Sequence, residues 1–235
     1  MANFDSKHVK NVVLVGHTGS GKTTLTESML FEAGLINRRG TILDKNTVAD
    51  YTDIEHEKGK TFFSKLVYTK WKDYKINLLD TPGYDDFAGE IIGAMRVADC
   101  GLMLLNSAMG VEVGTDIIWT YTDEYKLPML LAVNHLDNEK SDFDKTVREA
   151  KAHFGNNVVV VQYPVNQGEK FDAIVDVLNM VMYKYPAEGG KPEKLPIPDS
   201  EKEKANQLHQ ELIETIAGND ETLMERYFEK GELDE

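Results

Sequence analysis

The segment "GHTGSGKT" at residues 16–23 has the clearest chemical pattern in the chain. It fits the phosphate-loop pattern G-x-x-x-x-G-K-[ST] and stands between an apolar run and a helix-forming segment. Glycines in such a loop let backbone N–H groups surround phosphate oxygens, while Lys22 supplies a positive charge and Thr23 offers a hydroxyl to magnesium. A chance glycine turn is the simpler alternative. The pattern predicts a nucleotide-binding segment made of Gly16, His17, Thr18, Gly19, Ser20, Gly21, Lys22, Thr23 and Thr24.

A second pattern, "DTPG" at residues 80–83, follows the apolar run "YKINLL". If that run is a strand of a parallel sheet, Asp80 lies at its carboxyl end, where such sheets bind ligands. We predict that Asp80 holds magnesium through water and that the Gly83 amide contacts the terminal phosphate. Thr61 stands just before another strand-like run and would complete the metal site with Thr23 and Asp80. An ordinary turn and a polar loop are the alternatives for these two segments.

A third pattern, "NHLD" at residues 134–137, resembles the guanine-reading sequence N-K-x-D with a histidine in place of lysine. Asp137 would accept two hydrogen bonds that guanine donates together and adenine does not. Asn134 would brace the loop, and the His135 ring would lie across the purine. The pattern therefore predicts a guanine nucleotide, with a plain strand-to-loop turn as the alternative.

These patterns need a scaffold that brings strand ends together, and the rest of the sequence supplies one. Strand-like and helical segments alternate, which predicts an α/β fold of the P-loop NTPase type. Its sheet should be mostly parallel, with helices on both faces and one antiparallel pair between residues 62 and 80. Residues 185–200 are rich in proline and glycine and are expected to be a connection. The expected strands are 11–15, 62–69, 74–80, 100–106, 128–134 and 158–164, and the expected helices are 22–33, 86–98, 112–126, 141–154, 201–217 and 221–230.

Composition narrows the choice of partners. The 235 residues are 41% hydrophobic, with one cysteine and no apolar stretch long enough to span a membrane, so we expect a cytoplasmic protein without a membrane partner. Residues 165–235 hold 17 acidic and 8 basic side chains, and therefore carry most of the net charge of -14. This balance argues against DNA and against a broad nucleic-acid surface. It favours a solvated acidic face or a docking surface for a basic partner.

Taken in order, the three patterns resemble those of translational GTPases, and the whole chain resembles the amino-terminal part of elongation factor G. The resemblance is carried by "GHTGSGKTTLTE", by "IEHEKGKT" in the first switch (residues 40–63), by "DTPGYDDFAGE" in the second switch (residues 80–90) and by "NSAMGVEVGTDIIW". Beyond "NHLD", the segments "FDAIVDVLNM" and "ELIETIAGNDETLMERYFEKGELDE" resemble the G′ insertion of that family.

The resemblance implies a GTP-binding domain over residues 1–164 and a smaller, incomplete α/β G′ subdomain over residues 165–235. The last strand of the GTP-binding domain, its G-S-A segment and the later domains of the family would be absent. The implied ligands are GTP or GDP and Mg²⁺. The implied partner of this cytoplasmic monomer is the ribosome, through large-subunit rRNA and the stalk protein, and the acidic G′ region is a candidate surface for the stalk.

Four positions depart from the family pattern. Thr18, Gly19 and Lys60 replace an apolar residue, an aspartate and a second apolar residue, and Tyr84 stands where the family has histidine. All four lie where the family gates and orients the attacking water, whereas the nucleotide- and metal-binding positions match. The resemblance implies a catalytic role for the Tyr84 position, together with Lys22 and Gly83.

The leading hypothesis is a GTP-binding domain that promotes ribosomal translocation with weak or absent hydrolysis. One alternative is an efficient ribosome-stimulated GTPase that orients water with another residue. A non-enzymatic nucleotide-binding interaction module and an ATP-using P-loop enzyme are alternatives from other classes. Asp137 separates the last of these from the rest, because it predicts a preference for guanine.

Overall fold

The computed structural model describes residues 4–187 and 189–218 of the chain. The chain divides into two compact units, Met1–His135 and Leu136–Glu235. The sequence analysis placed the boundary between the GTP-binding domain and the G′ subdomain between residues 164 and 165, and that boundary stays a prediction. The helix expected at residues 221–230 lies outside the described residues. No helix within the described residues combines the length and the apolar character that crossing a membrane requires.

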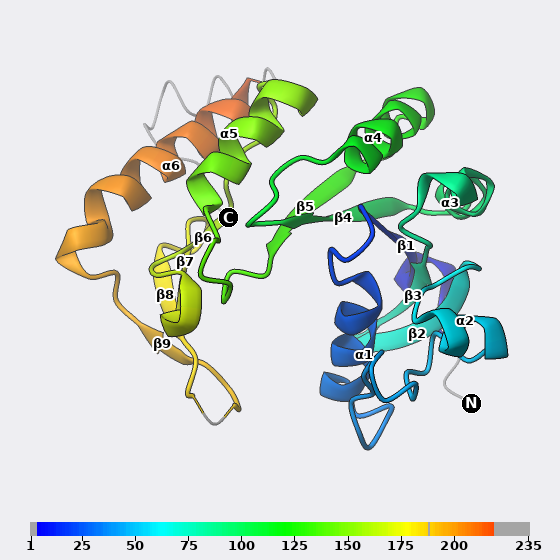
Figure 1. Cartoon of the computed structure of the whole chain (residues 1–235). Coiled ribbons are helices and arrows are strands. Elements are labelled where there is room, and N and C mark those ends of the chain that lie inside the picture. Colours follow the sequence, from blue (N-terminus) through cyan, green and yellow to red (C-terminus); the bar gives the residue numbers. More distant parts are fainter. Residues whose placement is uncertain (1–3, 188, 219–235) are drawn as a thin grey trace. The chain divides into compact units, whose positions relative to one another are not determined.

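The described part of the first unit is built on a five-stranded sheet with the order β2-β3-β1-β4-β5 (Figure 1). All neighbouring strands run parallel except β2 and β3, which pair antiparallel. The predicted parallel sheet with one antiparallel pair is therefore confirmed. The strands are β1 (Val9–Val15), β2 (Lys65–Trp71), β3 (Tyr74–Asp80), β4 (Cys100–Asn106) and β5 (Met129–Asn134).

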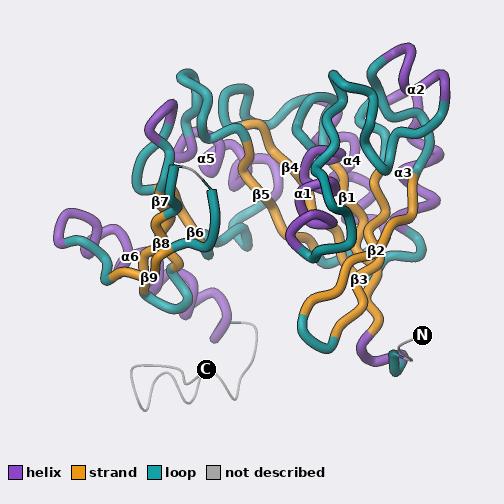
Figure 2. The backbone as a smooth tube through the Cα atoms, turned by 90° about the horizontal axis from the view of Figure 1, so that it is seen from below, coloured by secondary structure: helices purple, strands orange, loops and turns teal. Residues whose placement is uncertain are grey.

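Helices cover both faces of this sheet. Helix α1 (Lys22–Glu32) lies on one face, while α3 (Ala88–Met95) and α4 (Val113–Tyr125) lie on the other (Figure 1). Figure 2 views the sheet from the side of α1. Apolar residues 13–15 of β1 and 103–105 of β4 are buried because helices cover both faces of these central strands. The fully or almost fully buried side chains include Val13, Leu14, Val15, Leu78, Met103, Leu104 and Leu105.

The parallel register brings the ends of the strands to one edge. Leu14 pairs with Asp80 across β1 and β3, and Asn106 pairs with Asn134 across β4 and β5. The loops that follow β1, β3 and β5 therefore leave the sheet at the same edge, which is where α/β sheets bind ligands. The three predicted motifs begin there.

The connection between α1 and β2 contains a short helix that the sequence analysis did not predict. Helix α2 (Asp53–Lys58) begins with a capping box, in which Thr52 accepts from the Glu55 N–H and Glu55 accepts from the Thr52 N–H. The strand predicted from residue 62 begins only at Lys65. The reason is that the backbone N–H groups of Phe62 and Phe63 donate to the Glu55 carboxylate instead of a strand partner.

The second unit contains a four-stranded antiparallel sheet with the order β6-β7-β8-β9 within its described residues. The strand predicted at 158–164 is shorter, and it does not extend the parallel sheet, because β6 pairs antiparallel with β7. The strand β9 lies inside the segment expected to be a plain connection. The described elements of this unit are β6 (Gln162–Pro164), β7 (Ala173–Asp176), β8 (Val181–Lys184), β9 (Glu193–Leu195), α5 (Phe143–Phe154) and α6 (Asp199–Ala217). Within residues 4–187 and 189–218, the 3-10 turns are Ser6–His8, Asp85–Phe87 and Gly168–Lys170.

Candidate nucleotide-binding site

The phosphate loop connects β1 to α1 and is shaped by close packing at two glycines. A Cβ on Gly16 would lie 2.5 Å from the carbonyl oxygen of Leu104, and one on Gly21 would overlap with Asn134 Nδ2. Both glycines also have positive φ, at 139° and 97°. A side chain at either position would displace the loop from the strands behind it.

Lys22 occupies the centre of this loop, at the first residue of α1. Its Nζ donates to the carbonyl oxygens of Gly16 at 2.8 Å and His17 at 3.0 Å, so the ammonium faces the inside of the loop. Burial lowers the pKa of Lys22 to about 8, while the carboxylates of Asp80 and Asp50 oppose that shift. The side chain therefore remains mostly cationic at neutral pH, where it meets the positive end of the helix dipole. Both features favour an anion such as a phosphate.

A cavity of about 280 Å³ opens beside the loop. It brings together residues from the phosphate loop, from both switches and from the end of β5. Most of the predicted site residues of the first unit line this cavity. The predicted residues that do not line it are Gly16, His17, Ser20, Asp80 and Asn134. The lining residues are Thr18, Gly19, Gly21, Lys22, Thr23, Thr24, Ile42, Asp50, Gly59, Lys60, Thr61, Gly83, Tyr84 and His135.

The three residues predicted for magnesium lie next to one another. Thr23 Oγ1 and Thr61 Oγ1 are 3.2 Å apart. Asp80 is completely buried, and neither of its carboxylate oxygens has a hydrogen-bond partner among the described residues. Burial raises the pKa of Asp80 to about 7. A buried carboxylate without a partner is costly, and a hard divalent cation with oxygen ligands would compensate it.

Asp50 belongs to the same cluster, and the sequence analysis missed it. Its Oδ2 accepts from Thr61 Oγ1 at 3.2 Å, and its Oδ1 is buried without a partner among the described residues. Burial raises the pKa of Asp50 as well. The residues thus fit Mg²⁺, which neutralises phosphate charge in sites of this kind. No local signal distinguishes Asp50 from the other acids of residues 50–57, because its position depends on a contact with Thr61.

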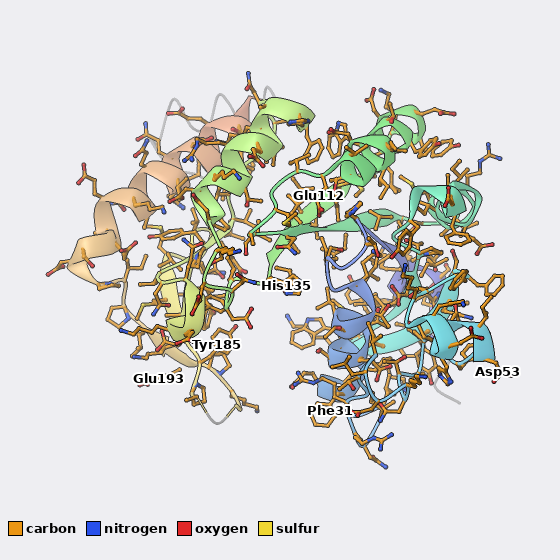
Figure 3. All side chains as sticks on the ribbon, viewed as in Figure 1. Phe31, Asp53, Glu112, His135, Tyr185 and Glu193 are labelled. Atoms are coloured by element: carbon orange, nitrogen blue, oxygen red, sulfur yellow. The ribbon has the colours of Figure 1, made fainter. Side chains whose placement is uncertain are left out.

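The end of β5 supports the phosphate loop from behind. Asn134 Nδ2 donates to the Ser20 carbonyl oxygen at 2.8 Å, as its predicted bracing role requires. His135 Nε2 lies 3.0 Å from the Gly19 carbonyl oxygen, and Figure 3 shows His135 at the end of this strand. Its predicted stacking on a purine stays a prediction. Asp137 is exposed and belongs to the second unit, so its predicted contact with guanine stays a prediction too.

His17 and Ser20 lie on the inner side of the loop. His17 Nε2 is 3.6 Å from Glu112 Oε1, at the residue before α4 (Figure 3). The Ser20 hydroxyl is buried and has no partner among the described residues. A hydroxyl in that state is available for a ligand oxygen or water.

Comparison with known proteins agrees with this geometry. Residues 7–227 match the family described as "Elongation factor Tu GTP binding domain", which is almost the whole chain. The chain belongs to this family. It is a translational GTPase domain, and domains of this family bind GTP and GDP.

Two relatives extend the comparison. An "Elongation factor G-like protein" of Thermotoga maritima is 35% identical to this GTP-binding domain over 223 residues, which cover 95% of the chain and 31% of that protein. A crystal structure of a protein from Thermus thermophilus is 34% identical with a TM-score of 0.89, covering 96% of this chain and 34% of that one. The chain thus spans about a third of the length of the relatives it matches.

Of the four positions of this GTP-binding domain that depart from the family pattern, Lys60 and Tyr84 contact each other, and Thr18 lies near Tyr84. Lys60 Nζ lies 4.2 Å from the centre of the Tyr84 ring. Interactions with Lys60 and, second, with Thr18 lower the pKa of the Tyr84 phenol. Tyr84 therefore joins the second switch to the first switch and to the phosphate loop. The sequence analysis placed these residues near the attacking water but did not predict their mutual contact.

Proposed function

We propose that the chain is the GTP-binding domain of an elongation factor G-like translation factor, which promotes ribosomal translocation and hydrolyses GTP slowly or not at all. The family match and the Thermotoga maritima relative support the first part. The contact of the Lys60 ammonium with the Tyr84 ring carries the second part.

Slow hydrolysis follows from what the Tyr84 hydroxyl can offer an attacking water. GTP hydrolysis needs a group that orients the water and stabilises developing charge. In this domain the Lys60 ammonium lies 4.2 Å from the centre of the Tyr84 ring, and interactions with Lys60 and Thr18 lower the pKa of the phenol. Unlike an imidazole, a phenol has no ring nitrogen that could accept a proton at neutral pH. We infer that Tyr84 orients water less well than a histidine at the same place.

The ligands and partners in this proposal follow from the family. GTP or GDP would bind with Mg²⁺ held by Thr23, Thr61 and, through water, Asp80. The ribosome would be the partner of a cytoplasmic monomer, through large-subunit rRNA and the stalk protein. Residues 165–235, which carry 17 acidic and 8 basic side chains, are the candidate G′ surface for the stalk.

One observation favours the alternative of an efficient GTPase. Lys60 brings an ammonium group to the same cavity as Lys22 and Gly83. A preorganised cation near the transferred phosphate can stabilise the charge that develops during hydrolysis. In that case Lys60 would supply what a histidine at position 84 supplies in relatives.

Translocation by the full-length protein tests the proposal. Ribosomes stalled before translocation are mixed with the protein and either GTP or a non-hydrolysable GTP analogue, and their position on the mRNA is read by toeprinting. We expect a one-codon shift with both nucleotides, at rates that differ less than about threefold, and no shift with Lys22→Ala. A shift that requires hydrolysable GTP would contradict the slow-hydrolysis part, and no shift with either nucleotide would contradict the translocation role.

A further inference from the structure

Lys60 differs in its surroundings from Lys58 and Lys65, the two lysines nearest to it in the sequence. Lys58 Nζ pairs with the exposed Glu57 at 2.8 Å, and the lysine that begins β2, Lys65, pairs with the buried Glu55 at 3.0 Å. Among the residues whose side chains are described, no carboxylate forms an ion pair with Lys60. Its ammonium charge is thus left without a counter-charge at the edge of the nucleotide cavity.

The position of this ammonium is fixed by uncharged partners. The Tyr84 ring lies below it, at 4.2 Å from ring centre to Nζ. Interactions with Lys60 and Thr18 lower the pKa of the Tyr84 hydroxyl. A cation over an aromatic face keeps its full charge while it loses rotational freedom. The Tyr84 ring therefore holds the Lys60 ammonium in place without neutralising its charge.

The same cavity is also lined by Lys22 of the phosphate loop. A Cβ on Gly83 would lie 2.6 Å from Lys22 Nζ and 2.7 Å from Thr18 Cα, so Gly83 sits directly against the phosphate loop. Tyr84 follows Gly83 in the chain, and its ring contacts the Lys60 ammonium. The cavity is thus bordered by two ammonium groups, Lys22 from the phosphate loop and Lys60 from the first switch.

We propose that Lys60, positioned by Tyr84, is a second phosphate-binding cation that contacts the terminal phosphate of GTP and sets a preference for GTP over GDP. The inference rests on the proposed GTP-binding function and names a specificity residue for it. Lys22 belongs to the loop that surrounds the phosphates shared by both nucleotides. Lys60 belongs to the first switch, which responds to the γ-phosphate. A charge that contacts the phosphate before reaction begins strengthens binding without accelerating hydrolysis.

Equilibrium binding separates the two nucleotides. The affinities of the full-length protein for fluorescent GDP and for a non-hydrolysable GTP analogue are measured for the parent, Lys60→Met, Lys60→Arg and the control Lys58→Met. Losing a charged hydrogen bond should weaken analogue binding by about ten- to a hundredfold in Lys60→Met, with GDP binding changed less than about twofold. Lys60→Arg keeps the charge and should retain most of the preference, and Lys58→Met should match the parent.

Tyr84→Phe tests the positioning role. It keeps the ring beneath Lys60 and removes the hydroxyl acceptor, so we expect a smaller loss of analogue binding, about threefold, and unchanged GDP binding. The inference is overturned if Lys60→Met weakens both nucleotides equally, or if it changes neither. These outcomes differ from a failure of the proposed function, in which the parent itself would bind neither nucleotide.

Discussion

The phosphate loop and the first switch border the same cavity but keep their shapes by different means. The loop depends on backbone: its glycines pack against β4 and β5, and its lysine donates to its own carbonyl oxygens. The first switch depends on buried acids. Glu27 accepts from the backbone N–H groups of Gly40 and Val48, and Glu55 accepts from those of Phe62 and Phe63.

Because the two regions are fixed by different means, they should respond differently to the substitution of a side chain. A loop fixed by glycines on a rigid sheet is preorganised, so it can bind phosphate without rearranging. A segment fixed by a few buried acids loses its order when one of them loses its partner. The comparison therefore predicts that the binding site is robust and that the switch depends on single side chains.

The largest expected effect concerns the buried pair of Glu55 and Lys65, whose side chains are 0% and 6% exposed. Glu55→Gln leaves the Lys65 charge buried without a partner, which should cost about 3–5 kcal/mol. Hydrogen exchange of the amides at residues 50–65 should show the loss. Glu57→Gln, at the exposed pair with Lys58, is the control and should change exchange little. Equal protection in both variants would contradict the role of Glu55.

Lys22→Ala should produce the next largest effect, this time in the loop. Removing a charged donor should weaken GDP and GTP binding by about 3 kcal/mol, roughly a hundredfold, with or without magnesium. Thr23→Ala is the matched comparison, because it should weaken binding only when magnesium is present. Calorimetric titrations with magnesium and with a chelator measure both. Equal losses for Thr23→Ala under the two conditions would remove Thr23 from the metal site.

A third prediction concerns Asp137. Replacing this carboxylate by Asn turns one acceptor towards a donor of guanine, which should cost about 1–3 kcal/mol of GDP affinity. Xanthosine diphosphate has a carbonyl in place of the exocyclic amine, so it should gain affinity for the variant. Glu139→Gln, another exposed acid of the same loop, is the control. Unchanged GDP affinity in Asp137→Asn would show that "NHLD" does not read guanine.

Asp50→Asn should have the smallest effect. The amide keeps the shape of the side chain but lowers its negative charge beside Thr61, so magnesium should bind about fivefold more weakly, an effect near 1 kcal/mol. The measurement is the magnesium concentration that half-maximally slows GDP release. Asp53→Asn, an exposed acid in the first turn of α2, is the control. An unchanged magnesium requirement would place Asp50 outside the metal site.

The sequence predicted the loop well because its pattern records backbone geometry. The positions of the glycines, of Lys22 and of Asp80 at the end of β3 all follow from local rules about turns, helix starts and strand ends. The strands β1, β3, β4 and β5 were predictable for a similar reason, since each contains a short apolar run bounded by polar or turn residues.

The first switch and the second unit were less predictable because their order comes from contacts between distant residues. Helix α2 and the late start of β2 depend on Glu55 reaching Phe62, Phe63 and Lys65. The antiparallel sheet of the second unit has strands of only three or four residues, which are too short for a period to be seen. Short elements of this kind are defined by their partners more than by their own residues.

The contact between Lys60 and Tyr84 depends both on a local sequence pattern and on a contact between distant residues. Each residue was identified by its departure from the family pattern, but nothing in the sequence indicated that the two side chains meet at 4.2 Å. If hydrolysis is slow and Tyr84→His alone does not restore it, the cause extends to Thr18, Gly19 and Lys60. If the single change restores it, Tyr84 is sufficient to explain it.

Single-turnover GTP hydrolysis on ribosomes tests the central claim most directly. The full-length protein and its Tyr84→His variant are each mixed with GTP and an excess of ribosomes, and phosphate release is timed against translocation in the same mixture. We predict that the parent translocates before it releases phosphate, and that Tyr84→His releases phosphate at least about tenfold faster than the parent. Phosphate release by the parent that is as fast as its translocation would contradict the account.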